Sequence, residues 1–340
     1  MTMFYELDNE QAYEVEVNHC VGVTGYHHWF FLHAIAEALH LDFRAFAVDC
    51  QGQRLGVVPL LFRRRGPVST VNNLPIGYVG PLIREDALRS GLLQELLKGV
   101  QPILRSYRTV ATRWAFAAAV TVDMVRLAAP EFKVEISENY VISGDTSVEV
   151  LLKSMSRSRR QAINRSLRKF KDRGVTVEDS SAEEVTQWLP TKIIDAYERQ
   201  GLPPLYKAAE VQCMAERLFA HPRMLWRTAK SSDGDVLGLA GCIIGEERVW
   251  GWLMAGIPIT GISPQILCYW DLIKWSLDRG LALDLGGAPN EGIRELKISL
   301  GADTETVVAA LHIRHKRIYN SGIAIVSALD GVAGLKNART

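Results

Sequence analysis

The chain has 340 residues, of which 48% are hydrophobic and 23% are charged, and its formal net charge is +1. This composition is that of an ordinary globular protein with room for about two domains, and the small net charge excludes a global field that would attract nucleic acid or membranes. No apolar run reaches the ~18 residues of a membrane span, no signal-peptide pattern opens the chain, and the five cysteines form no C-x-x-C pair. We therefore expect a cytoplasmic protein with free thiols.

Hydrophobic periodicity and turn residues predict alternating helices and strands in the first half of the chain. In chain order we expect a helix over Tyr26–Leu39, a hairpin of Phe43–Val48 and Leu55–Phe62, a turn-rich stretch to Pro81, one helix over Asp86–Tyr107 with Asp86 as N-cap, and strands at Val110–Ala119 and Val134–Ile142.

The second half repeats this alternation. We expect one helix over Ser147–Arg173 closed by Gly174, helices over Val185–Gln200 and Ala208–Ala220, a hairpin around Gly234, a strand at Arg248–Ala255, a helix over Pro264–Arg279, a strand at Leu281–Leu285 and a helix over Glu291–Leu300. The tail, residues 318–335, is apolar enough to pack back on the body.

One phrase occurs twice, 182 positions apart. Gly52-x-x-Leu55-Gly56 returns as Gly234-x-x-Leu237-Gly238, and each copy lies between β-prone residues. A supersecondary phrase repeated at the spacing of a domain indicates two copies of one domain. Duplicated domains of this kind commonly bind a ligand in a groove.

The segment from Lys153 to Arg173 contains nine cations and one acid, so its net charge is +8 while the rest of the chain sums to −7. At helical spacing, five cations lie on one narrow face and apolar residues lie on the opposite face, with Arg159 directed into the apolar arc. The five are Lys153, Arg157, Arg160, Arg168 and Lys171. The face is either a solvated surface or a binding surface for phosphates, RNA or an acidic carrier protein. Arg159 on the apolar side favours a functional role, because an unpaired buried cation is costly.

A second group follows a short apolar strand. Asp284 lies inside that strand, and Arg294 and Lys297 are one turn apart on one face of the next helix. Asp284 and Lys297 can form an ion pair that joins strand to helix, or Lys297 can stabilise negative charge that develops in a groove.

Other candidates are weaker. Trp250 and Trp252 alternate along one strand and so face one side, as a core or as a groove wall. The histidines match no metal-ligand spacing, so we expect no metal, and no Ser/His/Asp or Cys/His nucleophile pattern is present.

Four motifs occur along the chain in a fixed order. They are Gly52 to Leu60 after the aromatic run His28-Trp29-Phe30; Gly77-Tyr78-Val79-Gly80-Pro81-Leu82; Ser156 to Arg160 with Ile163 and Gly174-Val175; and Asp284, Gly286, Glu291-Gly292, Lys297 and Gly301. In the order and spacing of these motifs, the chain resembles the FemAB/FemX family of aminoacyl transferases over most of its length. It departs from the family in Leu296, where a Phe is usual, and in lacking a helical-hairpin arm.

The resemblance implies an α+β fold of two GNAT-like (N-acetyltransferase-like) domains in tandem, each a mixed central sheet flanked by helices. We place these domains at residues 1–145 and 146–310, with residues 311–340 packing back on the body. It implies direct transfer of an aminoacyl group from tRNA to an amine, which forms an amide bond.

The resemblance also implies roles for single residues. Lys297 and Asp284 are the expected catalytic residues, and strand N–H groups near Trp252 to Met254 are expected to hold the oxyanion with Lys297. The expected substrate-binding residues are Arg294, Tyr206, Trp252, Tyr269 and Arg159, and the expected donor-binding residues are Arg157, Arg160, Arg168 and Lys171.

Coenzyme A is disfavoured as donor. The segment Gly256 to Pro264, where GNAT enzymes carry a basic, glycine-rich pyrophosphate turn, has no basic residue. We therefore expect no cofactor and favour aminoacyl-tRNA or an acyl carrier protein. The alternatives are an acyl-coenzyme A transferase and a non-catalytic relative that only binds RNA or protein.

Overall fold

The computed structural model describes residues 2–72, 79–116, 119–259 and 264–315. The contacts divide the chain into two compact units: unit 1 contains residues 1–22, 41–136 and the segment from residue 308, and unit 2 contains residues 23–40 and 137–307. The domain boundaries expected after residues 145 and 310 stay predictions, and most of the segment 311–340 lies outside the described residues.

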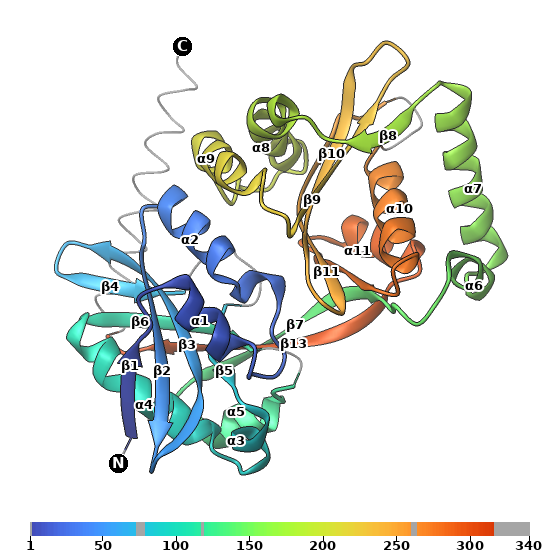
Figure 1. Cartoon of the computed structure of the whole chain (residues 1–340). Helices are drawn as coiled ribbons and strands as arrows, with labels where there is room; N and C mark the ends of the chain where they lie inside the picture. Colours follow the sequence, from blue (N-terminus) through green and yellow to red (C-terminus); the bar gives the residue numbers. More distant parts are fainter. Residues whose placement is uncertain (1, 73–78, 117–118, 260–263, 316–340) are drawn as a thin grey trace. The chain divides into compact units, whose positions relative to one another are not determined.

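Unit 1 is a mixed sheet with helices (Figure 1). Its elements are β1 (Thr2–Glu6), α1 (Glu10–Val17), β2 (Asp42–Cys50), β3 (Gln53–Arg65), β4 (Val68–Val71), β5 (Leu82–Ile83), α3 (Glu85–Arg89), α4 (Leu93–Ser106), β6 (Thr109–Phe116), α5 (Val122–Ala128) and the end of β13 (Asp303–Ile313). The strand order is β1-β2-β3-β4-β6-β13, with β5 paired to β3.

Unit 2 repeats this plan. Its elements are a 3-10 turn (Gly25–His27), α2 (Trp29–Ala38), the end of β7 (Lys133–Ile142), α6 (Val148–Ser154), α7 (Arg157–Asp172), β8 (Thr176–Asp179), a π-helical turn (Glu184–Trp188), α8 (Leu189–Arg199), α9 (Ala208–Leu218), β9 (Met224–Lys230), β10 (Val236–Ile244), β11 (Arg248–Gly256), α10 (Pro264–Leu277), β12 (Ala282–Gly287) and α11 (Glu291–Ser299). The strand order is β8-β9-β10-β11-β12-β7.

The two sheets match strand for strand. In each, an antiparallel hairpin is followed by one parallel pair, β4 with β6 and β11 with β12, and the sheet ends in an antiparallel strand from the other half of the sequence. The hairpin turns contain Gly52 and Gly234 at φ +83° and +89°, a backbone region that favours glycine. The expected α+β fold of two GNAT-like repeats is confirmed.

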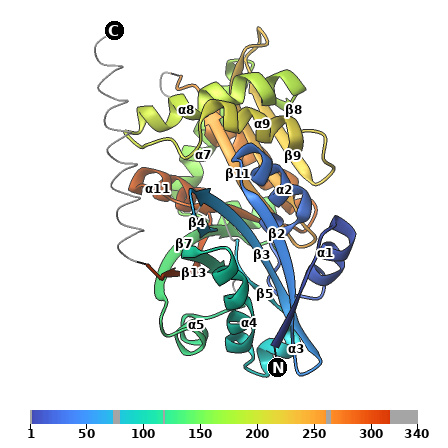
Figure 2. The ribbon, with the colours of Figure 1, turned by 90° about the vertical axis from the view of Figure 1, so that its left-hand side faces the viewer.

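Apolar faces hold each sheet to its helices. In unit 1, α4 lies beside the sheet (Figures 1 and 2). It buries a stripe at helical spacing that includes Leu96, Val100 and Ile103, and this stripe packs with Phe62 and Trp114 of the sheet. Each fully buried side chain of this size contributes about 1.5–3 kcal/mol.

In unit 2, α10 packs against β10, β11 and β12, while α8 contacts β11 and α9, and α2 lies against α9. The segment 23–40, early in the chain, is therefore part of unit 2.

Three expectations need correction. The helix expected over 86–107 is two helices, because Gly91 at φ +72° interrupts it, and Arg84 replaces Asp86 as N-cap. The helix expected over 147–173 is also two, because Met155 is extended and Ser156 caps α7 through a bond from the Arg159 N–H. The strand β13 was not expected at all.

Candidate functional site

The two central strands of unit 2, β11 and β12, pair over only three residues. Their parallel register runs from Arg248 opposite Ala282 to Trp250 opposite Asp284, and β11 then continues to Gly256. Beyond Trp250, β11 has no partner strand on the β12 side within the described part of the chain. The candidate site in unit 2 is built around this point, where β11 is no longer paired with β12 although it stays paired with β10; we call this stretch, Gly251 to Gly256, the released stretch of β11.

Lys297 lies beside the end of β12. Its side chain comes from α11 and is 4% exposed. The ammonium Nζ donates to the carbonyl oxygens of Leu285, Gly286 and Gly287 at 2.5, 3.1 and 2.6 Å. Burial lowers the pKa of Lys297 from 10.5 to about 8, and Asp284 opposes that shift. Lys297 therefore joins α11 to β12 through three carbonyls and not through the Asp284 carboxylate.

Asp284 is a buried carboxylate, 1% exposed, with its own donors. It accepts from Asn139 Nδ2 at 3.1 and 3.2 Å and from the Gly286 N–H at 2.6 Å, and it lies 3.9 Å from Arg248 Nη1. The bond to Gly286 holds a left-handed residue at φ +73° within β12, where the register with β7 shifts between Asp284 and Gly287. Asp284 thus fixes the backbone that Lys297 binds.

Tyr26 brings the early segment of the chain to this point. Its hydroxyl donates to the carbonyl of Gly251 at 2.7 Å. Gly251 directly follows Trp250, the last residue of β11 that pairs with β12. Burial raises the pKa of Tyr26, and Asp284, Cys242 and Tyr206 raise it further. Sequence reasoning missed Tyr26 because it assigned this segment to the first domain; no local pattern in the sequence indicates the contact.

Tyr206 is buried, and its pKa is raised by burial, Tyr197 and Glu210. Tyr206 is also one of the groups that raise the pKa of the buried Tyr26.

Trp252 is half-buried on β11, with its ring 5.2 Å from Phe31 and 5.9 Å from Trp226 in edge-to-face geometry. It lies on the released stretch of β11, and Trp250, at 6% exposure, is a core residue.

Arg294 and Lys297 share the helix face that was expected. Both interact with Tyr140: the ammonium of Lys297 lies 5.9 Å from its ring centre, and a hydrogen bond to Tyr140, followed by Glu291, raises the pKa of Arg294. Arg294 is exposed and bonds Glu291 at 2.9 Å.

Tyr269 is part of the apolar packing of unit 2. It is on α10 against the hydrophobic core, and its pKa is raised by burial and by the thiols of Cys242 and Cys268. None of the contacts found for it in the described residues reaches Lys297 or Asp284.

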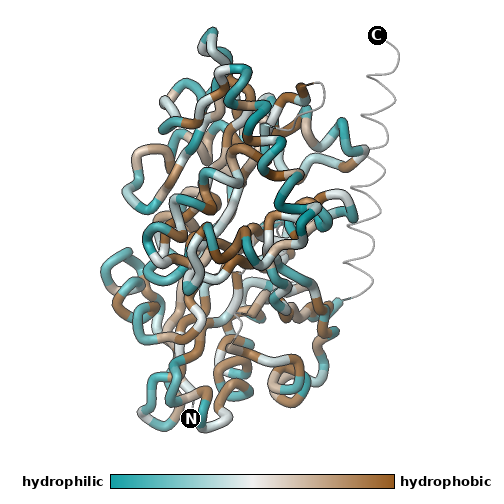
Figure 3. Tube along the Cα trace, turned by 90° about the vertical axis from the view of Figure 1, so that its right-hand side faces the viewer, coloured by the Kyte–Doolittle hydropathy of each residue, from teal (hydrophilic) through white to brown (hydrophobic). Residues whose placement is uncertain are grey.

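The basic face of α7 is open. Arg157, Arg168 and Lys171 are exposed and Arg160 is half-buried, and none of the four forms an ion pair with a described residue. By contrast, arginines elsewhere in unit 2, such as Arg227 with Asp179 and Asp271, are paired. Figure 3 shows the side of unit 2 on which α7 lies in Figure 1, and the helix that crosses this side is coloured mainly as hydrophilic.

Arg159 was expected on the buried face of α7 and is exposed instead. The buried residues of this helix are Ile163 and Phe170, one or more turns further on. The first turn, which contains Arg159, therefore lies clear of the core, and the argument from a buried cation does not hold.

Some of the residues that bear on the choice of acyl donor and on the family resemblance lie outside the part of the chain that the structure describes. The segment 260–263 precedes α10, and Gly77 and Tyr78 precede β5; all are undescribed. No helix among the described residues has the length and apolarity of a membrane span.

Residues 157–293 match the family described as acetyltransferase (GNAT) domain. Among solved structures, FemX superposes on 93% of this chain and 99% of its own, with a TM-score of 0.69 and 15% identity. For a tandem GNAT protein from the clavulanic acid biosynthesis pathway, the superposition covers 93% of this chain and 99% of that protein, with a TM-score of 0.55 and 11% identity. For L-PGS from Bacillus licheniformis it covers 90% of this chain and 93% of that protein, with a TM-score of 0.55 and 15% identity. No curated protein matches the sequence.

The family match supports an acyltransferase, with a GNAT domain at residues 157–293, and the superpositions extend the GNAT fold over most of the chain. Within that class the chain has the tandem arrangement of FemX, so the resemblance to the FemAB/FemX family is confirmed at the level of the fold.

Proposed function

We propose that this protein transfers an aminoacyl group from aminoacyl-tRNA to an amine acceptor and forms an amide bond. The observation that carries the proposal is the unpaired basic face of α7, in the same unit as the released strand β11. A polyanionic donor suits such a face, because phosphates replace the acidic partners that it lacks.

In this reaction the acceptor amine attacks the ester carbonyl of the donor. The new C–N bond forms as the carbonyl becomes an oxyanion; the C–O bond to the tRNA ribose then breaks, and the ribose hydroxyl leaves with the proton that the amine gives up. Holding the two reactants together supplies a large part of the rate.

Backbone N–H groups of β11 at Trp252 to Met254 are the donors that we assign to the oxyanion. All three N–H bonds of Lys297 are engaged with carbonyls, so it acts on the oxyanion through its charge and by fixing the end of β12. Asp284 is a positioning residue in this scheme, and no residue is assigned as general base.

For the acceptor side we assign Tyr206, Trp252 and Arg294. Trp252 lies on the stretch of β11 beyond its pairing with β12, Tyr206 contributes to the raised pKa of Tyr26, and Arg294 lies one turn from Lys297 on α11. Tyr269 and Arg159 are further candidates.

An acyl-coenzyme A donor is the second candidate. It is favoured by the match of residues 157–293 to an acetyltransferase (GNAT) domain and by the similarity to the tandem GNAT protein from the clavulanic acid biosynthesis pathway, which is described in a form without AcCoA. The lack of basic residues between Gly256 and Pro264 counts against it.

Charge reversal on α7 tests the donor surface. The triple variant Arg157→Glu, Arg160→Glu, Arg168→Glu should bind bulk tRNA at least tenfold more weakly, and the slope of log affinity against log salt should shrink by roughly two to three. A matched control reverses Arg89, Lys98 and Arg126, exposed cations of unit 1 that face acids. Equal affinity and slope in both triple variants would remove α7 as the donor surface.

A further inference from the structure

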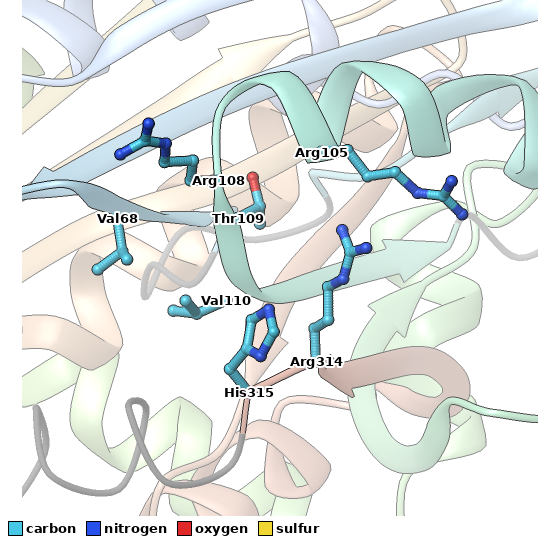
Figure 4. A pocket seen from close by; sticks show the side chains of 7 residues that line it. All are labelled: Val68, Arg105, Arg108, Thr109, Val110, Arg314 and His315. Atoms are coloured by element: carbon cyan, nitrogen blue, oxygen red, sulfur yellow. The ribbon is translucent and has the colours of Figure 1, made fainter.

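Unit 1 contains a cavity of about 380 Å³ that plays no part in the proposed reaction. It is lined by Val68, Arg105, Arg108, Thr109, Val110, Arg314 and His315. Figure 4 shows that the lining comes from the end of α4, the start of β6 and the end of β13. Segments about 200 positions apart in the sequence thus place three arginines around one hollow, and none of the described lining residues is acidic.

The positive charge of the three arginines is not neutralised by acidic side chains among the described residues. None forms an ion pair with a described residue, and all three are exposed. Arg105 and Arg108 lie at the C-terminal end of α4, where the helix dipole offers about half a negative charge. Arg314 follows β13, away from that helix end in the sequence. An excess of more than two positive charges is left to attract an anion.

The backbone at Arg108 supports a role for its side chain. Arg108 follows the C-cap of α4 at φ +49°, a left-handed position that glycine usually occupies at helix ends. A non-glycine residue there is strained, because its Cβ lies too close to the following carbonyl oxygen. The protein holds a guanidinium at this place in spite of that cost.

The size and lining indicate the kind of anion. The volume lies within the range of small-molecule pockets, whereas an RNA strand needs an extended basic track. Val68 and Val110 add an apolar surface beside the arginines. Arginine is the side chain best suited to hold phosphate oxygens through paired N–H donors.

We propose that this cavity binds a phosphorylated small molecule, with the phosphate held by Arg105, Arg108 and Arg314 and the apolar part of the ligand against Val68 and Val110. The exposed arginine side chains extend to different sides in Figure 4, and rotation about their bonds brings them onto the phosphate. The site belongs to unit 1, and the proposal is independent of the donor assigned to α7.

Calorimetric titration with phenyl phosphate and with inorganic phosphate, at constant ionic strength, tests the site. The wild-type protein should bind one phenyl phosphate, more tightly than inorganic phosphate because of the two valines. Arg105→Ala and Arg314→Ala should each weaken binding about tenfold or more, since each removes charge-assisted hydrogen bonds. Arg126→Ala, an exposed arginine of α5 that lies 3.7 Å from Asp123, is the matched control and should bind normally.

Arg108→Gly separates binding from folding. It should weaken phenyl phosphate binding while raising the thermal midpoint, because glycine relieves the left-handed backbone. The α7 triple variant should keep full phenyl phosphate binding, which distinguishes this site from the proposed tRNA surface. Absence of saturable binding, equal weakening in Arg126→Ala, or dependence on these arginines for an RNA oligonucleotide alone would overturn the proposal.

Discussion

At the scale of single residues, Lys297 has two roles that a substitution affects together. Its ammonium holds three carbonyls at the end of β12 and also places a positive charge beside the released strand. Lys297→Met should reduce turnover by roughly 10²-fold or more. It should also lower the free energy of unfolding by about 2–5 kcal/mol, because buried carbonyls lose their donor.

Lys274→Met is the matched control, because Lys274 is an exposed lysine on α10. Turnover of both variants is compared at a temperature where each remains folded by circular dichroism. Wild-type turnover in Lys297→Met would exclude its charge from the mechanism.

The lowered pKa of Lys297 predicts a pH dependence. If the charged form is needed, turnover should fall as the pH rises through about 8. Between pH 8 and 10.5 the unfolded chain holds a proton that the folded lysine has released, so this group makes the folded state more stable as the pH rises. The loss of turnover should therefore occur without a loss of thermal stability attributable to Lys297. Constant turnover from pH 7 to 9.5 would contradict the prediction.

Tyr26 supplies a test of the part of the site that the sequence did not reveal. Tyr26→Phe removes one hydroxyl and its bond to the Gly251 carbonyl, at a cost of about 1 kcal/mol in stability. Because that carbonyl lies where β11 leaves β12, turnover should fall about tenfold. Tyr5→Phe, which removes an exposed phenol hydroxyl on β1 of unit 1, is the control. Equal turnover in both variants would show that the Tyr26 bond is only structural.

At the scale of elements, the repeated hairpin can be tested by its two turn glycines. A Cβ added at Gly52 or Gly234 meets no atom within 4 Å, so the only cost of alanine is the left-handed backbone. Gly52→Ala and Gly234→Ala should each lose about 1–2 kcal/mol by denaturant unfolding. Gly292→Ala, in the first turn of α11 with no left-handed φ, should be neutral or stabilising. Clearly unequal costs at Gly52 and Gly234 would contradict the equivalence of the two hairpins.

The ends of helices and hairpins show how much of the fold could be predicted from the sequence. The turn at Gly52 and the C-cap at Gly174 follow from local backbone chemistry and were predicted correctly. The breaks at Gly91 and Met155 were missed, because the apolar spacing continues across each. Arg159 shares the helix face of Ile163 and Phe170, but the first turn of α7 lies clear of the core, and the sequence pattern could not show where the core ends.

At the scale of the whole molecule, the sequence indicated the tandem fold through one repeated phrase. It could not indicate that β7 and β13 each complete a sheet with strands from the other half of the sequence, because pairing at such distance has no local signature. The same limit hid Tyr26 and the arginine cavity. Asp284 and Lys297 were found because a charge inside an apolar strand and a lysine between glycines are visible locally, although their partners were not.

The donor is the central claim, and one assay tests it directly. Purified protein is offered an aminoacyl-tRNA mixture, acyl carrier protein and acyl-coenzyme A in parallel with a panel of amines, and amide products are measured by mass spectrometry. We predict product from the aminoacyl-tRNA reaction alone, abolished by prior ribonuclease treatment and strongly reduced in the α7 triple variant. Efficient, ribonuclease-resistant transfer from acyl-coenzyme A alone would contradict the account and leave an N-acyltransferase that uses coenzyme A.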